Sequence, residues 1–125
     1  DMLIVAPQGV ICIENKHVVG LIKGKTTDKY WKQIKKHEKK KMYNPIFQNE
    51  GHIKCLKYHF NKRQCLDIPI IGYVIFSNNK AKLGTDMSNV GTLEDFKRFY
   101  TNFIVGKKPQ LNVNKICRIV DNIKK

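Results

Sequence analysis

The first sixteen residues, DMLIVAPQGVICIENK, decide the fold of this chain. Two short β-prone runs, residues 3–5 and 10–13, flank the tripeptide Pro7-Gln8-Gly9. Proline suits the first central position of a turn, and glycine adopts positive φ values without steric cost. The pattern therefore predicts a β-hairpin over residues 1–16.

Helical signals occur in three later segments. Asn44 and Pro45 are typical of a helix start, and apolar residues follow at near-helical spacing to about residue 63. Thr92, with Asp95 three residues later, predicts a second, capped helix, and residues 114–123 carry the apolar spacing of a third.

The segments between the helices are more varied. The continuous apolar run at residues 68–76 predicts a strand covered on both faces. We expect short strands at residues 21–23 and within the turn-rich stretch 77–91. Residues 32–41, KQIKKHEKKK, cannot bury a face, which predicts a solvated loop or a short surface helix. The order of elements predicts a single mixed α/β domain over residues 1–125.

The chain is strongly basic, with 24 Lys and Arg against 10 Asp and Glu and a formal net charge of +14. Such a charge favours a polyanionic partner, either nucleic acid or an anionic surface, although a lysine-rich composition bias gives the same total. Only three basic residues are Arg, which argues against sequence-specific reading of bases. No apolar run approaches the roughly 18–20 residues of a membrane span, which rules out a transmembrane protein. Of the possible partners we expect nucleic acid and not a membrane.

Four cysteines, at positions 12, 55, 65 and 117, lie in or beside apolar stretches and form no C-x-x-C pair. Small disulfide scaffolds carry denser cysteines in loops. The pattern predicts four reduced core thiols in a cytoplasmic protein. Because the sequence begins at Asp1 without a Met, we also expect the chain to be part of a longer protein.

Charged residues end the second strand of the predicted hairpin. Glu14 and Lys16 are two residues apart and share one face of the strand, whereas Asn15 takes the other. If Asp1 lies opposite Glu14, two carboxylates converge, and they repel unless a cation lies between them. Mg²⁺ prefers oxygen ligands and keeps waters that attack phosphates. Lys16 would then stabilise the charge on the phosphate or orient the attacking water.

This arrangement sets a condition on the turn. A two-residue turn that pairs Ala6 with Gly9, or a bulge, aligns Asp1 with Glu14, whereas a strict three-residue loop aligns Asp1 with Asn15. The alternative interpretation is that the two acids are exposed charges at a strand end, since isolated D…E-x-K matches are common by chance.

The predicted helix over residues 44–63 offers a second polar group. Gln48 and His52 are four residues apart and share a face, from which Gln48 can hydrogen-bond a phosphate or a metal-bound water. An ordinary polar helix face gives the same pattern. His52, Cys55 and His59 also suggest zinc, but a structural zinc site needs four ligands, so we favour Cys55 as a core residue.

Residues 23–41 hold nine lysines together with two adjacent aromatic residues. Ammonium groups beside aromatic rings favour binding along a nucleic-acid backbone with base stacking. The alternative is that the aromatic residues pack on the core and the lysines are only solvated. The candidate nucleic-acid-binding residues are Lys23, Lys25, Tyr30, Trp31, Lys35, Lys36, Lys39, Lys40 and His52.

Several blocks, taken in order, resemble the nuclease-related domain, NERD, which is placed in the PD-(D/E)XK nuclease superfamily. The blocks are residues 1–16, Gly20-x-Ile22-x-Gly24, Trp31, Asn44-Pro45-Ile-x-Gln48-Asn49 and Val74-x-Phe76-Ser77, and the resemblance is strongest over residues 1–100. It implies a restriction-endonuclease-like mixed sheet flanked by helices, here lacking its N-terminal elements. The C-terminal helix, which we assign to residues 112–125, follows from the apolar spacing and lies beyond the region of resemblance.

The resemblance also implies roles for single residues. Asp1 and Glu14 correspond to metal-binding carboxylates, Lys16 to the catalytic lysine, and the backbone carbonyl of Asn15 to a further metal ligand. Gln48 resembles a helical Gln of exonuclease branches, where Tyr stands four residues later. Asp1, Glu14, Lys16 and Gln48 are thus the expected catalytic residues.

The implied activity is hydrolysis of DNA phosphodiester bonds with Mg²⁺ or Mn²⁺ as cofactor. A non-catalytic nucleic-acid-binding or protein-interaction module of the same fold is the alternative. The family's domain companions add a fused or partner helicase or kinase domain to the expectations.

Overall fold

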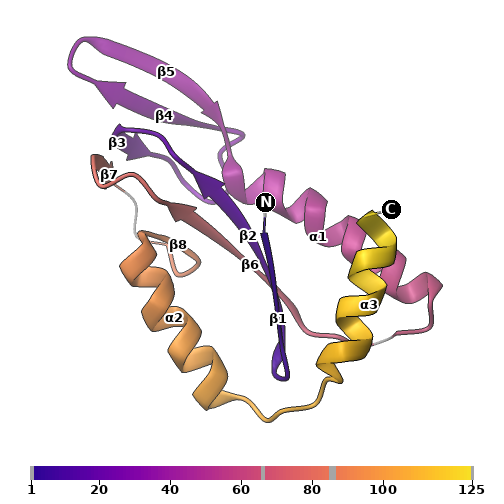
Figure 1. Ribbon diagram of the computed structural model, residues 1–125. Coiled ribbons are helices and arrows are strands. Elements are labelled where there is room, and N and C mark those ends of the chain that lie inside the picture. The colour runs from indigo at the N-terminus through magenta and orange to yellow at the C-terminus, as the bar shows by residue number, and fades with distance from the viewer. Residues whose placement is uncertain (1, 66, 85–86, 125) are drawn as a thin grey trace.

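The structure is a computed structural model that describes residues 2–65, 67–84 and 87–124 (Figure 1). In chain order its elements are β1 (Met2–Ala6), β2 (Gly9–Lys16), β3 (Gly20–Lys23), β4 (Tyr30–Lys35), β5 (Glu38–Tyr43), α1 (Pro45–Lys62), β6 (Ile70–Phe76), β7 (Ala81–Leu83), β8 (Val90–Gly91), α2 (Leu93–Gly106) and α3 (Val113–Lys124). The predicted mixed α/β class is confirmed.

The predicted N-terminal hairpin forms one side of a first sheet with the order β1-β2-β6-β8. Ala6 pairs with Gly9, so the turn between β1 and β2 holds only Pro7 and Gln8. This is the register that the metal hypothesis requires, although Asp1 itself lies outside the described residues. β2 then pairs in parallel with β6, and α1 lies in the long connection between these two strands.

Helices cover both faces of the first sheet (Figure 1). Successive side chains of β2 point to opposite faces. Val10 and Cys12 pack with apolar residues of α1 and α3, whereas Ile11 and Ile13 pack with aromatic residues of α2. β6 is buried from Tyr73 to Phe76, which confirms the prediction of a strand covered on both sides.

The prediction for residues 32–41 is wrong, because these residues belong to a second hairpin. β4 and β5 are antiparallel, and Lys36 lies in the turn between them with a φ of 37°. The hairpin continues a second sheet with the order β5-β4-β3-β7. Backbone pairing and one deeply buried aromatic residue stabilise this hairpin, although its other side chains are largely polar. The polarity of the single residues therefore does not predict the two strands.

Trp31 is that buried residue. Its side chain is 0% exposed and stacks on Phe76 of the first sheet with ring centroids 6.4 Å apart. The indole N–H donates to the backbone carbonyl of Lys25 at 2.9 Å. A Cβ at Gly24 would lie 2.2 Å from the indole ring, so glycine is needed there. The prediction that Trp31 contacts nucleic acid is therefore wrong, because its ring lies in the core.

Capping groups set the starts of the first two helices, as the sequence predicts. Asn44 accepts from the backbone N–H of Ile46 at 2.8 Å, and its amide donates to the carbonyl of Asp28 at 2.7 Å. Thr92 and Asp95 form a reciprocal capping box. The pKa of Asp95 is lowered, chiefly by the hydrogen bond from the Thr92 backbone. Partial burial acts to raise this pKa, whereas the Thr92 hydroxyl and the Arg98 guanidinium lower it further.

The prediction of four core thiols holds for part of the set only. All four cysteines are free; Cys12 is buried and Cys65 is half-buried. Cys55 and Cys117 are exposed, so the prediction is wrong for both. Each of them directly precedes or follows a buried helical residue, and neighbours in a helix point about 100° apart.

No helix of the described residues is long and apolar enough to cross a membrane.

We expect Trp31→Ala to lower the free energy of unfolding by about 3–5 kcal/mol, because it removes a large buried ring and leaves a cavity. The neighbouring exposed residue provides the control, and Tyr30→Ala should cost less than about 1 kcal/mol. Urea denaturation followed by circular dichroism measures both. Equal losses for the two variants would contradict the burial of Trp31.

Candidate active site at the polar end of β2

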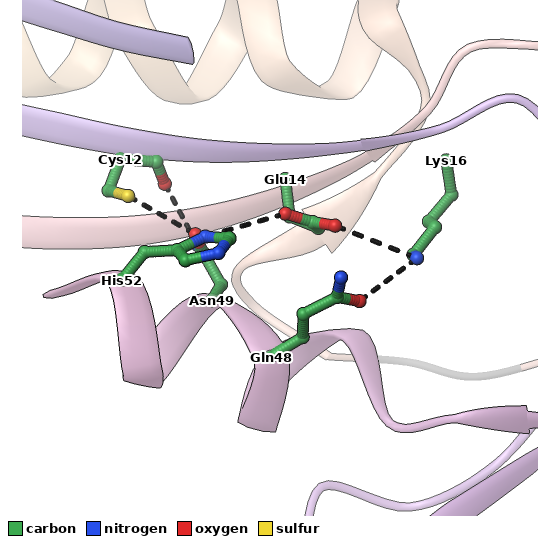
Figure 2. Close-up of polar contacts among 6 residues, drawn as sticks. All are labelled: Cys12, Glu14, Lys16, Gln48, Asn49 and His52. Carbon is green, nitrogen blue, oxygen red and sulfur yellow. Dashed lines mark hydrogen bonds and ion pairs between the residues drawn. The ribbon is translucent and has the colours of Figure 1, made fainter. Parts of the chain in front are cut away.

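Two polar stripes face each other where β2 lies against α1 (Figure 2). Cys12, Glu14 and Lys16 follow one another on the α1 side of the strand. Across from them α1 presents three polar side chains within its first two turns: Gln48, Asn49 and His52. The apolar ends of the same two elements pack together in the core, so their polar ends coincide as well.

Lys16 links the strand to the helix. Its ammonium donates to Oε1 of Gln48 at 3.0 Å and lies 3.6 Å from Oε1 of Glu14. The Lys16 side chain is 23% exposed, so the amine reaches solvent while its position is restrained from two sides. The prediction that Glu14 and Lys16 share a face is confirmed, and Gln48 joins them.

Glu14 is buried at the centre of this group, with 3% of the residue exposed. One carboxylate oxygen faces Lys16, and the other, Oε2, lies 3.7 Å from Nδ1 of His52. Oε2 is buried and accepts no hydrogen bond from the described part of the chain. A buried carboxylate is costly unless it is paired or coordinates a metal. This oxygen therefore favours a cation beside it.

A divalent ion fits this donor chemistry, because Mg²⁺ and Mn²⁺ select carboxylate and carbonyl oxygens. Among the residues that the structure describes, Glu14 supplies the one buried carboxylate. Within residues 2–65, 67–84 and 87–124, no group of three or more His, Cys, Asp or Glu side chains is placed to hold a metal ion. The second predicted carboxylate, Asp1, lies outside those ranges, and the contribution of the Asn15 carbonyl stays a prediction.

Asn49 fixes the helix to the strand directly behind the charged group. It is 2% exposed, donates to the carbonyl of Cys12 at 2.9 Å and accepts from the Cys12 thiol at 3.2 Å. A Cβ at Gly72, the β6 partner of Cys12, would lie 3.0 Å from the Asn49 amide. Glycine at this position therefore lets α1 approach the sheet closely. Burial, followed by the charge of Glu14, raises the pKa of the Cys12 thiol.

Of the other predicted site residues that the structure describes, all but His52 lie outside this group. His52 contacts Glu14 and so belongs to the candidate active site. Asn15 is exposed and points to the opposite face of β2. The second sheet and the loop that precedes β4 carry Lys23, Lys25, Tyr30, Lys35, Lys36, Lys39 and Lys40.

Sequence reasoning missed the role of Cys12 and left that of Asn49 open. A signal for Cys12 was present in the period of two, since residues 12, 14 and 16 must share a face. No comparable signal marked Asn49, because its contact depends on the close approach of α1 over Gly72.

The fold and this group together define a class of protein. A mixed α/β fold with a carboxylate and a lysine two residues apart on a central strand is consistent with the restriction-endonuclease-like fold of the PD-(D/E)XK superfamily. The model of the nuclease-related domain matches residues 1–77, so the chain belongs to the NERD family. No curated protein and no solved structure matches the chain.

We expect Asn49→Ala to lower the free energy of unfolding by about 1–3 kcal/mol, because it leaves the buried carbonyl of Cys12 without that donor. Asn61→Ala, at an exposed position of the same helix, is the matched control and should change stability by less than about 0.5 kcal/mol. Chemical denaturation of both variants measures the difference. A neutral Asn49→Ala would show that this contact does not hold α1 in place.

The raised pKa of Cys12 gives a second expectation. Near pH 7.5, iodoacetamide should alkylate the exposed Cys55 and Cys117 while Cys12 stays unmodified, because the thiolate is the reactive form and burial disfavours it. Peptide mass spectrometry identifies the labelled sites, and addition of denaturant should make Cys12 reactive. Labelling of Cys12 in the folded protein at the rate of Cys55 would contradict its burial.

Proposed function

We propose that this chain is a metal-dependent nuclease that hydrolyses DNA phosphodiester bonds at the Glu14–Lys16 group. The observation that carries the proposal is the buried carboxylate of Glu14, whose Oε2 accepts no hydrogen bond within the described chain while an ammonium lies 3.6 Å from its other oxygen. Membership of the NERD family supports a nuclease-related function.

The cofactor in this proposal is Mg²⁺ or Mn²⁺, held by Glu14, by Asp1 and by the backbone carbonyl of Asn15. When bound, such an ion lowers the pKa of a coordinated water and polarises the phosphate. Glu14 supplies the negative charge that attracts the ion. The positive field needed at the phosphate oxygens comes from the protein's own lysine.

Lys16 stabilises the negative charge that develops on the phosphate, because its ammonium is restrained before the substrate arrives. Gln48 orients that ammonium through the 3.0 Å hydrogen bond. Gln48 is therefore a positioning residue for Lys16 in this proposal, and its amide N–H₂ is available to the phosphate. His52 lies against the other edge of Glu14 and restrains that carboxylate.

The alternative is a nucleic-acid-binding module of the same fold without cleavage activity. The net charge of +14 favours it, since electrostatic attraction to a polyanion needs neither Asp1 nor a metal. The two functions differ in one observable, because only the nuclease produces new strand ends when a divalent ion is added.

We expect the protein to cleave labelled DNA with Mg²⁺ or Mn²⁺ and not in EDTA. Glu14→Gln and Lys16→Met should each lower the cleavage rate by about 100-fold or more, because each removes one preorganised charge. The control Glu94→Gln makes the same chemical change at an exposed carboxylate on α2 and should leave the rate unchanged. Gel electrophoresis of the products measures the rates.

Cleavage that survives both Glu14→Gln and Lys16→Met would contradict the assigned site. Salt-sensitive binding without cleavage in any divalent ion would favour the non-catalytic alternative. Thermal unfolding of the variants ensures that lost activity does not reflect lost folding.

A further inference from the structure

One face of the second sheet points away from the core; we name it the outer face. Trp31 and its cross-strand partner Met42 point to the inner face, where they pack with the apolar cluster around Phe76. Because side chains alternate along a strand and paired residues share a face, the register defines the outer set. It consists of Tyr30, Lys32 and Ile34 on β4, Lys39, Lys41 and Tyr43 on β5, Leu21 and Lys23 on β3, and Lys82 on β7.

The outer face carries a row of lysines at right angles to the strands. Lys23 pairs with Lys32, and Lys32 pairs with Lys41, so three ammonium-bearing side chains follow one another across three neighbouring strands. Adjacent strands lie about 4.8 Å apart, and like charges directly opposite each other destabilise a sheet. The outer set holds no acidic residue. The one acidic residue of the hairpin, Glu38, pairs with Lys35 and belongs to the inner face.

Two exposed tyrosines lie beside this row. Tyr30 and Tyr43 are 48% and 45% exposed, and their rings form an edge contact with centroids 6.2 Å apart. The ammonium groups of Lys29 and Lys41 lie 5.6 and 5.7 Å from the Tyr30 ring centroid. An unpaired nucleotide needs this combination, because its base stacks on a ring while its phosphates meet neighbouring cations.

The aromatic residues also connect the outer face to the candidate active site. Tyr43 contacts Phe47 with centroids 6.4 Å apart, and Phe47 directly precedes Gln48 on α1. Gln48 in turn binds the ammonium of Lys16. A nucleic-acid strand that crosses the outer face toward Tyr43 therefore reaches the start of α1, where the polar side chains of the candidate active site lie.

We propose that the outer face binds a single-stranded segment of the DNA substrate, with Lys23, Lys32 and Lys41 on its phosphates and Tyr30 stacked on a base. This inference deepens the proposed function and rests on it for the identity of the substrate. It commits to unpaired DNA because exposed rings have no access to the stacked bases inside a duplex.

The test measures binding in EDTA, where cleavage plays no part. Fluorescence anisotropy of a labelled 20-nucleotide oligothymidylate gives the affinity of the wild type and of the triple variant K23Q/K32Q/K41Q. We expect the triple variant to bind at least tenfold more weakly than the wild type. The slope of log K against the logarithm of the salt concentration should be smaller in magnitude by about 2, because each phosphate contact to a single strand contributes roughly 0.7 to that slope.

A matched control removes the same charge elsewhere. The variant K57Q/K62Q/K115Q changes three exposed lysines on the C-terminal half of α1 and on α3, at the other end of the molecule from β5 (Figure 1). We expect it to keep most of the wild-type affinity. Equal weakening by the two triple variants would overturn the proposal, because net charge alone would then account for binding.

Tyr30 tests the stacking part of the proposal. Tyr30→Ala should weaken oligothymidylate binding by about tenfold. Tyr30→Phe keeps the ring and should bind with the wild-type affinity. A 20-base-pair duplex should bind more weakly than the single strand and respond less to Tyr30→Ala. A neutral Tyr30→Ala, or equal losses on both DNA forms, would overturn the single-strand assignment.

Two further measurements separate this inference from its rivals. Vesicles with 30% phosphatidylserine probe an anionic membrane surface; loss of vesicle binding in K23Q/K32Q/K41Q while oligothymidylate binding is unchanged would overturn the proposal. Glu14→Gln should lower the cleavage rate by about 100-fold or more and should not weaken binding in EDTA. Absence of cleavage with intact, lysine-row-dependent binding would reject the nuclease activity and keep the binding face.

Discussion

The burial of the Glu14 carboxylate is the constraint on which the rest of the structure depends. A carboxylate at 3% exposure between a strand and a helix is tolerated only with partners at close range. Lys16 comes from the same strand face, and His52 comes from α1, so the helix must lie directly over β2. Gly72 permits this close approach, because any larger side chain there would meet α1.

Stability does not account for such a group. Replacing a buried ion pair by apolar residues of similar volume is often neutral or stabilising, by about 1–4 kcal/mol. The same face of β2 and the same face of α1 become apolar away from the candidate active site, where Val10 packs with Leu56 in the core. A chain that needed only to fold could have continued this packing. Polar groups that cost stability are expected where a protein binds or reacts, which supports the site that we propose.

The sequence predicts most of the first sheet and its helices because their signals are local. Pro7, Asn44 and Thr92 mark chain reversals and helix starts through their own hydrogen bonds and backbone preferences, and the structure has these elements at those places. The pairing of Glu14 with Lys16 followed from the period of a strand. The β4–β5 hairpin could not be predicted in this way, because it depends on the burial of Trp31 against Phe76 from another sheet.

The two sheets place their lysines in different surroundings. The first sheet surrounds one restrained ammonium with partners, whereas the second sheet places Lys23, Lys32 and Lys41 side by side, and none of its described strands adds an acidic residue to their face. Repulsion within that row opposes folding, and in the complex that we propose the phosphates of the DNA offset this repulsion. The proposal therefore couples the stability of the second sheet to DNA binding, because a ligand that binds only the folded lysine row stabilises the folded sheet.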